Sequence, residues 1–228
     1  MSEIWLLLQS GSGEPARNMA LDETLLENSP QIAQPILRFY SWSERAATFG
    51  YSQHFSELER VTHLRPLIRR PTGGGLVPHD SDWTYSLIFP PNHSWYALKA
   101  VESYERVHLW IRDVFQKIGV ATELSPCCKK EIPGQCFIGA EKSDVLWHGR
   151  KIAGAAQRRT KTGLLIQGSV QPPPISLQRI DWENAMCDVA CENFNVIWND
   201  FVPDENLIGL ASNVSQQKYS QPSYNRKR

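Results

Sequence analysis

The sequence predicts one α+β domain, in which a mixed, mostly antiparallel sheet is flanked by helices. The chain of 228 residues fits a single large domain, and hydrophobic residues make up 41% of it, enough for a substantial core. Several strand-like runs follow one another between only a few helical segments. Because this order lacks the strict strand–helix alternation of a parallel sheet, helices packed outside a mixed sheet are expected.

The first helix is expected at residues 14–28. Leu21 and Leu25 lie four residues apart and so share one face of a helix, and Pro15 stands near its start, where proline is well tolerated. The apolar run before it, residues 4–8, is short and has no basic leader. We therefore expect no signal peptide.

Strands and one long helix follow. The helix is expected at about residues 95–118, where Val107, Ile111, Val114 and Ile118 recur at helical steps and Gly119 provides the stop. The strand-like runs before it are residues 36–40, 46–49, 67–70 and 83–89.

The second half begins with an irregular segment. Residues 125–139 contain two prolines and three cysteines without periodicity, which predicts a loop. Residues 144–147 and 150–156 then flank His148-Gly149, a pattern typical of a tight hairpin. A further strand is expected at residues 164–170, and three consecutive prolines end it.

The C-terminal part is divided by composition. Residues 175–198 are expected to be helical in part, and the sequence from residue 211 onward is polar. We therefore assign residues 1–210 to a catalytic domain and residues 211–228 to a polar tail. That tail should be poorly ordered except where Tyr219 or Tyr224 docks.

Charge and cysteine usage exclude several classes of protein. The 24 basic residues balance the 24 acidic ones, which argues against a nucleic-acid-binding protein. No apolar run approaches the roughly 20 residues that a membrane span needs. The five cysteines, in a chain without a predicted secretory signal, suggest reduced thiols and a cytoplasmic location. No metal site is expected, because Cys-x-x-Cys and His-Glu-x-x-His are missing.

The most informative segment is residues 69–80, which read Arg-Arg-Pro-Thr-Gly-Gly-Gly-Leu-Val-Pro-His-Asp. Three glycines without side chains let backbone N–H groups approach a ligand closely, although triple glycine also occurs in ordinary turns. The run is neither a dinucleotide-binding motif nor a P-loop. Since Arg69 and Arg70 alternate along their strand, at most one of them should face the glycines.

This segment resembles the signature of the lipoate-protein ligase and octanoyltransferase family, and other segments resemble that family in the same order. The resemblance spans nearly the whole chain. It implies the catalytic-domain architecture of biotin and lipoate protein ligases, and it favours Arg70 as the arginine beside the glycines. The further segments are residues 18–23, 37–42, 49–53, 149–157, 165–169, 218–220 and 224–225.

Lys151 is the strongest catalytic candidate. On a regular strand, Lys151, Ala153 and Ala155 face one way and Gly154 and Ala156 the other, so a thin alkyl chain could lie beside a cation. By itself, the pattern fits an exposed hairpin lysine better, because lysine is mostly a surface residue. The resemblance instead favours an active-site role for Lys151, because the family's active-site lysine occurs in the same Gly-Arg-Lys-Ile-x-Gly motif.

Cys136 and His79 are further candidates. Cys136 precedes Lys151 by fifteen residues in a predicted loop, and a loop thiol near a cation can form a nucleophilic thiolate. An unreactive thiol is the alternative, but the region resembles cysteine-containing octanoyltransferases. His79 could be a general base or an orienting donor, and an ordinary histidine bonded to Asp80 remains equally open.

The resemblance implies an octanoyltransferase that needs no cofactor. Cys136 would accept an octanoyl group from acyl carrier protein as a thioester, and Lys151 would stabilise the oxyanion. The acceptor would be a lysine of a lipoyl domain, from a 2-oxoacid dehydrogenase or the glycine cleavage H protein. We expect a slender apolar channel for the acyl tail, lined by Gly73, Gly74, Gly75, Ala153, Gly154 and Ala155, with Arg70, His79 and Lys151 at its mouth.

Two alternatives remain open. In an ATP-dependent lipoate-protein ligase that forms a lipoyl-adenylate with Mg, Lys151 would bind the phosphate and the acyl carbonyl, and Cys136 would be incidental. In a non-catalytic protein, the domain would only dock lipoyl or acyl carrier domains. The shortness of the chain and the loop cysteine count against the ligase. The retained lysine, glycines and cysteine count against the non-catalytic protein.

Overall fold

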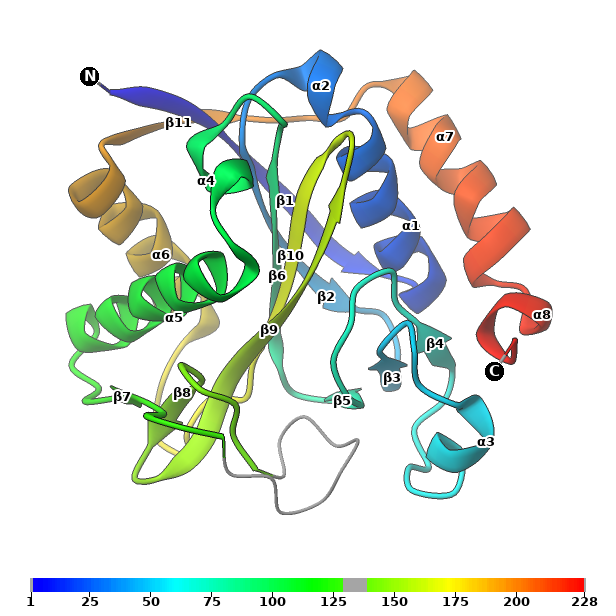
Figure 1. The fold of residues 1–228 in the computed structure, drawn as a ribbon, viewed down its shortest axis with the longest axis horizontal. Helices are drawn as coiled ribbons and strands as arrows, with labels where there is room; N and C mark the ends of the chain where they lie inside the picture. Colours follow the sequence, from blue (N-terminus) through cyan, green and yellow to red (C-terminus); the bar gives the residue numbers. More distant parts are fainter. Residues whose placement is uncertain (1, 129–138, 228) are drawn as a thin grey trace.

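The computed structural model describes residues 2–128 and 139–227, which form a large mixed sheet with helices on both faces and a small second sheet at one end (Figure 1). Strand β1 pairs in parallel with its two neighbours, and all the other neighbouring strands of the large sheet are antiparallel. This confirms the expected fold class. In spatial order the strands are β11 (Val196–Asp200), β1 (Glu3–Gly13), β2 (Ile36–Trp42), β6 (Trp83–Phe89), β10 (Gly163–Val170), β9 (Arg150–Thr160), β8 (Val145–Trp147) and β7 (Glu123–Leu124).

One face of the large sheet packs against α4 (Ser94–Ala97), α5 (Ala100–Lys117) and α6 (Arg179–Phe194) (Figure 1). The residues that recur along α5, Val107, Ile111 and Val114, are buried in this core together with aromatic side chains of the strands. The expected long helix is thus confirmed, although Leu98 and Lys99 separate a first short turn from the main helix.

The other face packs against α1 (Pro15–Glu27) and α7 (Glu205–Val214), and the short α2 (Ser29–Ile32) follows α1. Leu21 and Leu25 of α1 meet Leu165 of β10 in a smaller core. Alternation along each strand divides the two cores: Leu37 and Phe39 of β2 face α5 and α6, whereas Ile36 faces α1.

The second sheet holds the glycine-rich segment. Its strands lie in the order β4 (Leu67–Arg69), β3 (Ala46–Phe49) and β5 (Val77–His79), and α3 (Phe55–Leu58) packs against them. Residues 70–76 connect β4 to β5, so the three glycines lie in a loop between two strands of this sheet.

The C-terminal residues are ordered as helices rather than as a loose tail. After α7 come a π-helical turn, η1 (Ser215–Tyr219), and α8 (Pro222–Asn225). Tyr219 is fully buried and donates a hydrogen bond to Glu23 of α1 at 3.0 Å, and Lys218 forms an ion pair with the same carboxylate at 2.6 Å. The docking of Tyr219 is confirmed, but the expectation of poor order is wrong, because a buried acceptor on α1 binds this polar segment.

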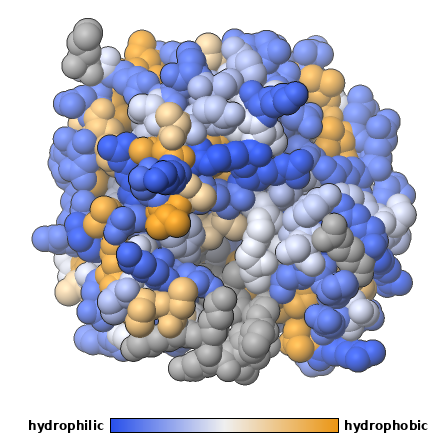
Figure 2. Space-filling view, viewed as in Figure 1, coloured by the Kyte–Doolittle hydropathy of each residue, from blue (hydrophilic) through white to orange (hydrophobic). Residues whose placement is uncertain are grey.

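The surface drawn in Figure 2 is mainly hydrophilic, with hydrophobic side chains in separate small patches. In the described part of the chain, none of the helices combines the length and the apolar character that crossing a membrane requires.

One buried histidine makes the stability of this fold depend on pH. His108 of α5 is fully buried, its Nδ1–H donates to the Tyr104 carbonyl at 2.7 Å, and Nε2 has no partner among the described residues. Burial lowers the pKa of His108 to about 4, although Asp144 partly opposes this. The unfolded chain therefore binds a proton near pH 6.5 that the folded protein excludes until about pH 4.

We expect His108 to contribute stability that is fully present above about pH 6.5 and lost as the pH falls toward 4. The loss should be about 3 kcal/mol. Urea unfolding of the wild type and His108→Leu between pH 4 and 7.5 would measure it as a smaller pH slope in the variant. His63→Leu, at an exposed position, should keep the wild-type slope. Equal slopes for the wild type and His108→Leu would contradict the prediction.

Candidate functional site

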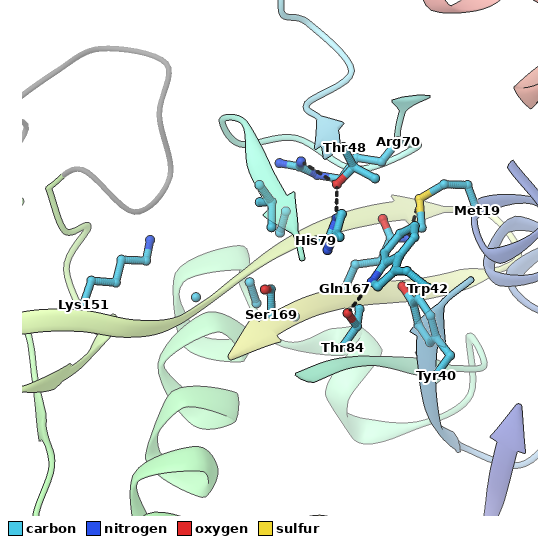
Figure 3. Close-up of a pocket in the computed structure, with 15 residues that line it drawn as sticks. Met19, Tyr40, Trp42, Thr48, Arg70, His79, Thr84, Lys151, Gln167 and Ser169 are labelled. Carbon is cyan, nitrogen blue, oxygen red and sulfur yellow. Dashed lines mark hydrogen bonds between the residues drawn. The ribbon is translucent and has the colours of Figure 1, made fainter. Parts of the chain in front are cut away.

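A pocket lies between β9 and β10 of the large sheet, the small sheet and α1. In Figure 3, Lys151 is at one end of the pocket and Met19, Tyr40 and Trp42 are at the other, with His79 and Ser169 between them. The pocket is lined by Met19, Tyr40, Trp42, Thr48, Arg70, Val77, His79, Thr84, Lys151, Gly154, Ala155, Ala156, Gln167, Gly168 and Ser169.

An irregularity in β9 turns Lys151 toward this pocket. Leu146 of β8 pairs with Lys151, but the preceding Val145 pairs with Ala153, so Ile152 is an extra residue in β9. The bulge shifts the alternation of side chains by one position. Lys151 therefore lies on the same face as Gly154, and both line the pocket.

The expected orientation of this strand is consequently wrong. Ala153 does not share a face with Lys151 but is buried in the core beneath α5 and α6. Ala155 borders the pocket, yet its side chain also packs against that core. Gly154 and Ala156, which regular alternation puts on the face opposite Lys151, lie on the pocket face.

The Lys151 side chain is almost completely enclosed. Its ammonium lies 2.8 Å from Oδ2 of Asp144, and only 6% of the lysine side chain and none of the aspartate side chain is exposed. The hydroxyl of Tyr104, from α5, donates to Oδ1 of the same carboxylate. The pocket thus ends at a buried ion pair, which sequence reasoning missed. A signal existed, because the predicted hairpin of residues 144–147 and 150–156 brings Asp144 close to Lys151, whereas nothing in the sequence brings Tyr104 to them.

Arg70 holds the glycine loop, as the resemblance implied. Its guanidinium donates to the carbonyl oxygen of Gly73 at 2.5 and 3.0 Å and to that of Gly75 at 2.8 Å. Arg69 points the other way and donates to the Tyr51 carbonyl at 2.7 Å. The fixed fork of an arginine suits this bridging of two carbonyls, which a lysine ammonium could not reproduce.

The three glycines lie beside the pocket rather than along it. Gly73, Gly74 and Gly75 are not among the described residues that line the cavity, whereas Arg70 is. Gly74 adopts a positive φ of 83°, and its carbonyl oxygen approaches Gly50 closely. The role of the loop in substrate binding stays a prediction. Its observed contacts are close packing against Gly50 and attachment to Arg70.

His79 lies inside a hydrogen-bonded row. Its Nδ1 is 2.9 Å from Oδ2 of Asp82, its Nε2 is 2.8 Å from Oγ1 of Thr48, and its ring stacks on Trp42 at 3.8 Å between centroids. The partner is thus Asp82 and not Asp80, whose side chain lies at the surface. Since both ring nitrogens are engaged, the geometry favours an orienting role over that of a free base.

Asp82 remains charged although it is buried. Burial raises its pKa, but the His79 ring and hydrogen bonds from His79, Ser169 and Thr84 outweigh this and lower it below the ordinary value. Ser169 and Thr84 donate to Oδ2 at 2.7 and 2.9 Å. Their hydroxyl hydrogens therefore point away from the pocket.

A second buried carboxylate fixes the far end of the pocket. Asp22 of α1 accepts hydrogen bonds from Arg38 at 2.6 Å, Ser86 at 2.7 Å, Gln167 at 2.7 Å and Tyr40 at 3.2 Å. Sequence reasoning missed Asp22, Asp82 and Gln167. A signal existed: polar residues occupy alternate positions of β2, β6 and β10, between residues of an apolar core.

Two further predictions from the sequence concern the nucleophile Cys136 and the absence of a metal site. Cys136 lies outside the described residues, so its place relative to Lys151 stays a prediction. Within residues 2–128 and 139–227, no three histidine, cysteine, aspartate or glutamate side chains come together as a metal site requires.

Comparisons with known proteins agree with this architecture. Residues 14–171 match the family model described as the lipoyl protein ligase A/B catalytic domain. Octanoyltransferase LipM of Staphylococcus epidermidis is 33% identical over 183 residues, covering 75% of this chain and 66% of that protein. Octanoyltransferase LipM of Bacillus subtilis is 34% identical over 181 residues, covering 74% and 65%. The chain thus spans slightly less than two thirds of these relatives.

Solved structures share the fold at lower identity. Lipoate-protein ligase A bound with ATP superimposes with a TM-score of 0.80 at 20% identity, covering 99% of both chains. A bi-partite lipoate protein ligase from Thermoplasma acidophilum, described with its E2 lipoyl domain, gives 0.78 at 20% identity and covers 99% of this chain and 97% of that one. These likenesses support the expected architecture.

The packing of the glycine loop can be tested at Gly50. A Cβ added at Gly50 would lie 1.9 Å from the Gly74 carbonyl oxygen, whereas one added at Gly73 meets nothing within 4 Å. Gly50→Ala should therefore lower the free energy of unfolding by about 1–3 kcal/mol, as overpacking does. Gly73→Ala should change it by less than about 1 kcal/mol. Urea denaturation would measure both, and equal effects would contradict the close approach.

Proposed function

Because the chain belongs to the lipoyl protein ligase A/B catalytic domain family, we propose that it is an octanoyltransferase. It would move an octanoyl group from acyl carrier protein to the lysine of a lipoyl domain. The observation that carries this proposal is the 33–34% identity to octanoyltransferases LipM over about three quarters of the chain. The pocket supports it, because a cation stands at the end of an elongated cavity.

The acyl tail would lie along the pocket toward Met19, Tyr40 and Trp42, with its carbonyl near Lys151 (Figure 3). Several lining residues are polar, contrary to the purely apolar channel expected from the sequence. However, the hydroxyl hydrogens of Thr84 and Ser169 are already donated to Asp82. The Gln167 amide likewise donates to the Asp22 carboxylate and to the sulfur of Met19. An alkyl chain can therefore cover these groups without breaking a hydrogen bond, and the high cost of stranding a buried donor is avoided.

Transfer of the octanoyl group would take place in two steps, acylation of Cys136 and then aminolysis of the enzyme thioester. The Cys136 thiolate attacks the carbonyl carbon of the octanoyl thioester, a new C–S bond forms, and the carrier thiol leaves after gaining a proton. The neutral amine of the acceptor lysine then attacks the enzyme thioester. A C–N bond forms, the amine loses a proton, and the Cys136 thiol is released. Aminolysis of a thioester needs no ATP.

Lys151 would stabilise the charge that develops on the carbonyl oxygen in both steps. A cation held in an enclosed site acts more strongly on a developing oxyanion than the same cation in water. Both Lys151 and Asp144 are buried, so the ammonium is already separated from bulk solvent before substrate arrives. The role of Cys136 rests on the sequence motif alone.

The covalent intermediate gives the most direct test. Wild-type protein incubated with octanoyl-acyl carrier protein without ATP should gain the mass of one octanoyl group, and hydroxylamine should remove it. Cys136→Ser should show no such adduct. Cys187→Ser should behave as wild type, because burial raises the pKa of the Cys187 thiol to about 12 and leaves little thiolate. Intact-mass spectrometry measures all three.

Two outcomes would contradict this assignment. A hydroxylamine-sensitive adduct on the Cys136→Ser protein that peptide mass spectrometry locates on a residue other than position 136 would place the nucleophile elsewhere. Acylation of a lipoyl domain that requires ATP and free lipoate would instead support the ligase alternative.

Lys151→Ala should slow transfer by about 10²–10³-fold, the usual effect of removing one oxyanion-stabilising group. The loss should appear mainly in kcat, since the residues that line the rest of the pocket and bind the tail are unchanged. Lys161→Ala, at an exposed turn residue of the neighbouring hairpin, is the matched control and should keep the wild-type rate. A wild-type rate for Lys151→Ala, measured by lipoyl-domain acylation, would exclude this role.

A further inference from the structure

Lys151 does not extend into open solvent but lies folded against its own strand. Its ammonium is 2.8 Å from Oδ2 of Asp144, in a place where both side chains are buried. A buried ammonium needs such a partner, because removing one member of a buried ion pair leaves an uncompensated charge.

The Asp144 carboxylate is itself held from two sides. Its Oδ1 accepts a hydrogen bond from the Tyr104 hydroxyl of α5, and its Oδ2 accepts one from the Glu141 backbone N–H at 2.6 Å. A carboxylate fixed by donors from different elements cannot rotate to follow a moving ammonium. The position of the ammonium is therefore dictated by α5 and by the turn before β8.

Gly154 supplies the space for this arrangement. A Cβ added there would lie 2.6 Å from Cε of Lys151, 2.8 Å from its Nζ and 3.2 Å from Oδ1 of Asp144. The bulge at Ile152 brings Gly154 onto the same face as Lys151. Only a residue without a side chain lets the lysine stem lie across that position.

We propose that Asp144 is a positioning residue that fixes the Lys151 ammonium at the end of the pocket, and that Gly154 provides the room this pair requires. The use of this position in acyl transfer rests on the proposed function. The pairing itself does not, so the two can be tested separately.

Other titratable groups around the pair fit this assignment. His108 of α5 has its pKa lowered to about 4 by burial, so it carries no charge near neutral pH. The side chain of Glu141 accepts a hydrogen bond from the Cys128 thiol at 2.8 Å. The Tyr104 hydroxyl donates a hydrogen bond to Oδ1 of Asp144. Among the described residues, Asp144 is the buried carboxylate that forms an ion pair with Lys151.

The test measures the reactivity of Lys151 without reference to catalysis. Reductive methylation with formaldehyde and cyanoborohydride modifies neutral amines, and peptide mass spectrometry gives the rate for each lysine. In wild-type protein at pH 8, Lys151 should react more slowly than the exposed Lys161. Asp144→Asn should raise the rate of Lys151 relative to Lys161 by about tenfold, because loss of an adjacent opposite charge favours the neutral amine.

Gly154→Ala tests the pairing of Lys151 with Asp144 independently, by taking away the space that the lysine occupies. It can replace Asp144→Asn if that variant does not fold. Its Cβ should displace the ammonium and raise the relative rate in the same direction. Combined with Asp144→Asn, it should add little, since both changes remove one interaction. Gly209→Ala in α7 is the matched control, because an added Cβ there meets nothing within 4 Å. Unchanged Lys151 rates in both Asp144→Asn and Gly154→Ala would overturn the pairing.

The catalytic use of the pair is decided by steady-state kinetics. Asp144→Asn should lower kcat for octanoyl transfer at least about tenfold and change KM for octanoyl-acyl carrier protein less than about threefold. A raised labelling rate with an unchanged kcat would refute positioning for catalysis while leaving the ion pair established. If the wild-type protein transferred no octanoyl group at all, the proposed function would fail, and the labelling result would still decide whether Asp144 holds Lys151.

Discussion

One extra residue in β9 controls the chemistry that the pocket presents. Without the bulge at Ile152, strict alternation would put Lys151 on the face of the sheet opposite Gly154 and Ala156. The lysine would then point toward the aromatic core under α5 and α6, where a charge could not be accommodated. The bulge instead places the ammonium on the pocket face. It also keeps Ile152 and Ala153 available to that core, in which both are buried.

The rest of the pocket depends on a polar layer inside the protein. Asp22 and Asp82 are both buried; Asp22 of α1 accepts hydrogen bonds from β2, β6 and β10, and Asp82 accepts them from β5, β6 and β10. Such networks are stable only when nearly every member is satisfied, and they then fix side-chain positions more firmly than apolar contacts do. The walls of the pocket are thereby set before any substrate binds. Apolar atoms and hydroxyls that already donate their hydrogens face the cavity, together with Arg70, His79, Gln167 and Lys151.

The sequence predicted those parts of the fold in which local pattern and final structure agree. Strands β2, β3, β4, β6, β8, β9 and β10, the main helix and the hairpin follow from periodicity and turn residues, and the arginine beside the glycine loop followed from the family motif. Strands β1, β5, β7 and β11 were not predicted. The predictions failed where the structure of a residue depends on a partner that is distant in the sequence. The orientation of Ala153 depends on pairing between β8 and β9, and the order of residues 215–219 depends on Glu23 in α1. The partner of His79 depends on how the turn after β5 folds back.

The local features around Lys151 contribute little to the stability of the fold or reduce it. A buried ion pair seldom stabilises a protein more than apolar side chains of the same size would, because desolvation offsets most of the attraction. Glycine within a strand also weakens it, through backbone entropy and the missing side chain. The bulge interrupts a ladder of hydrogen bonds as well. The ion pair, the glycine and the bulge together determine the position of one ammonium, that of Lys151, between Asp144 and Gly154. Their common effect is to place a charged group at the end of the pocket, and this is what stabilisation of an acyl oxyanion requires.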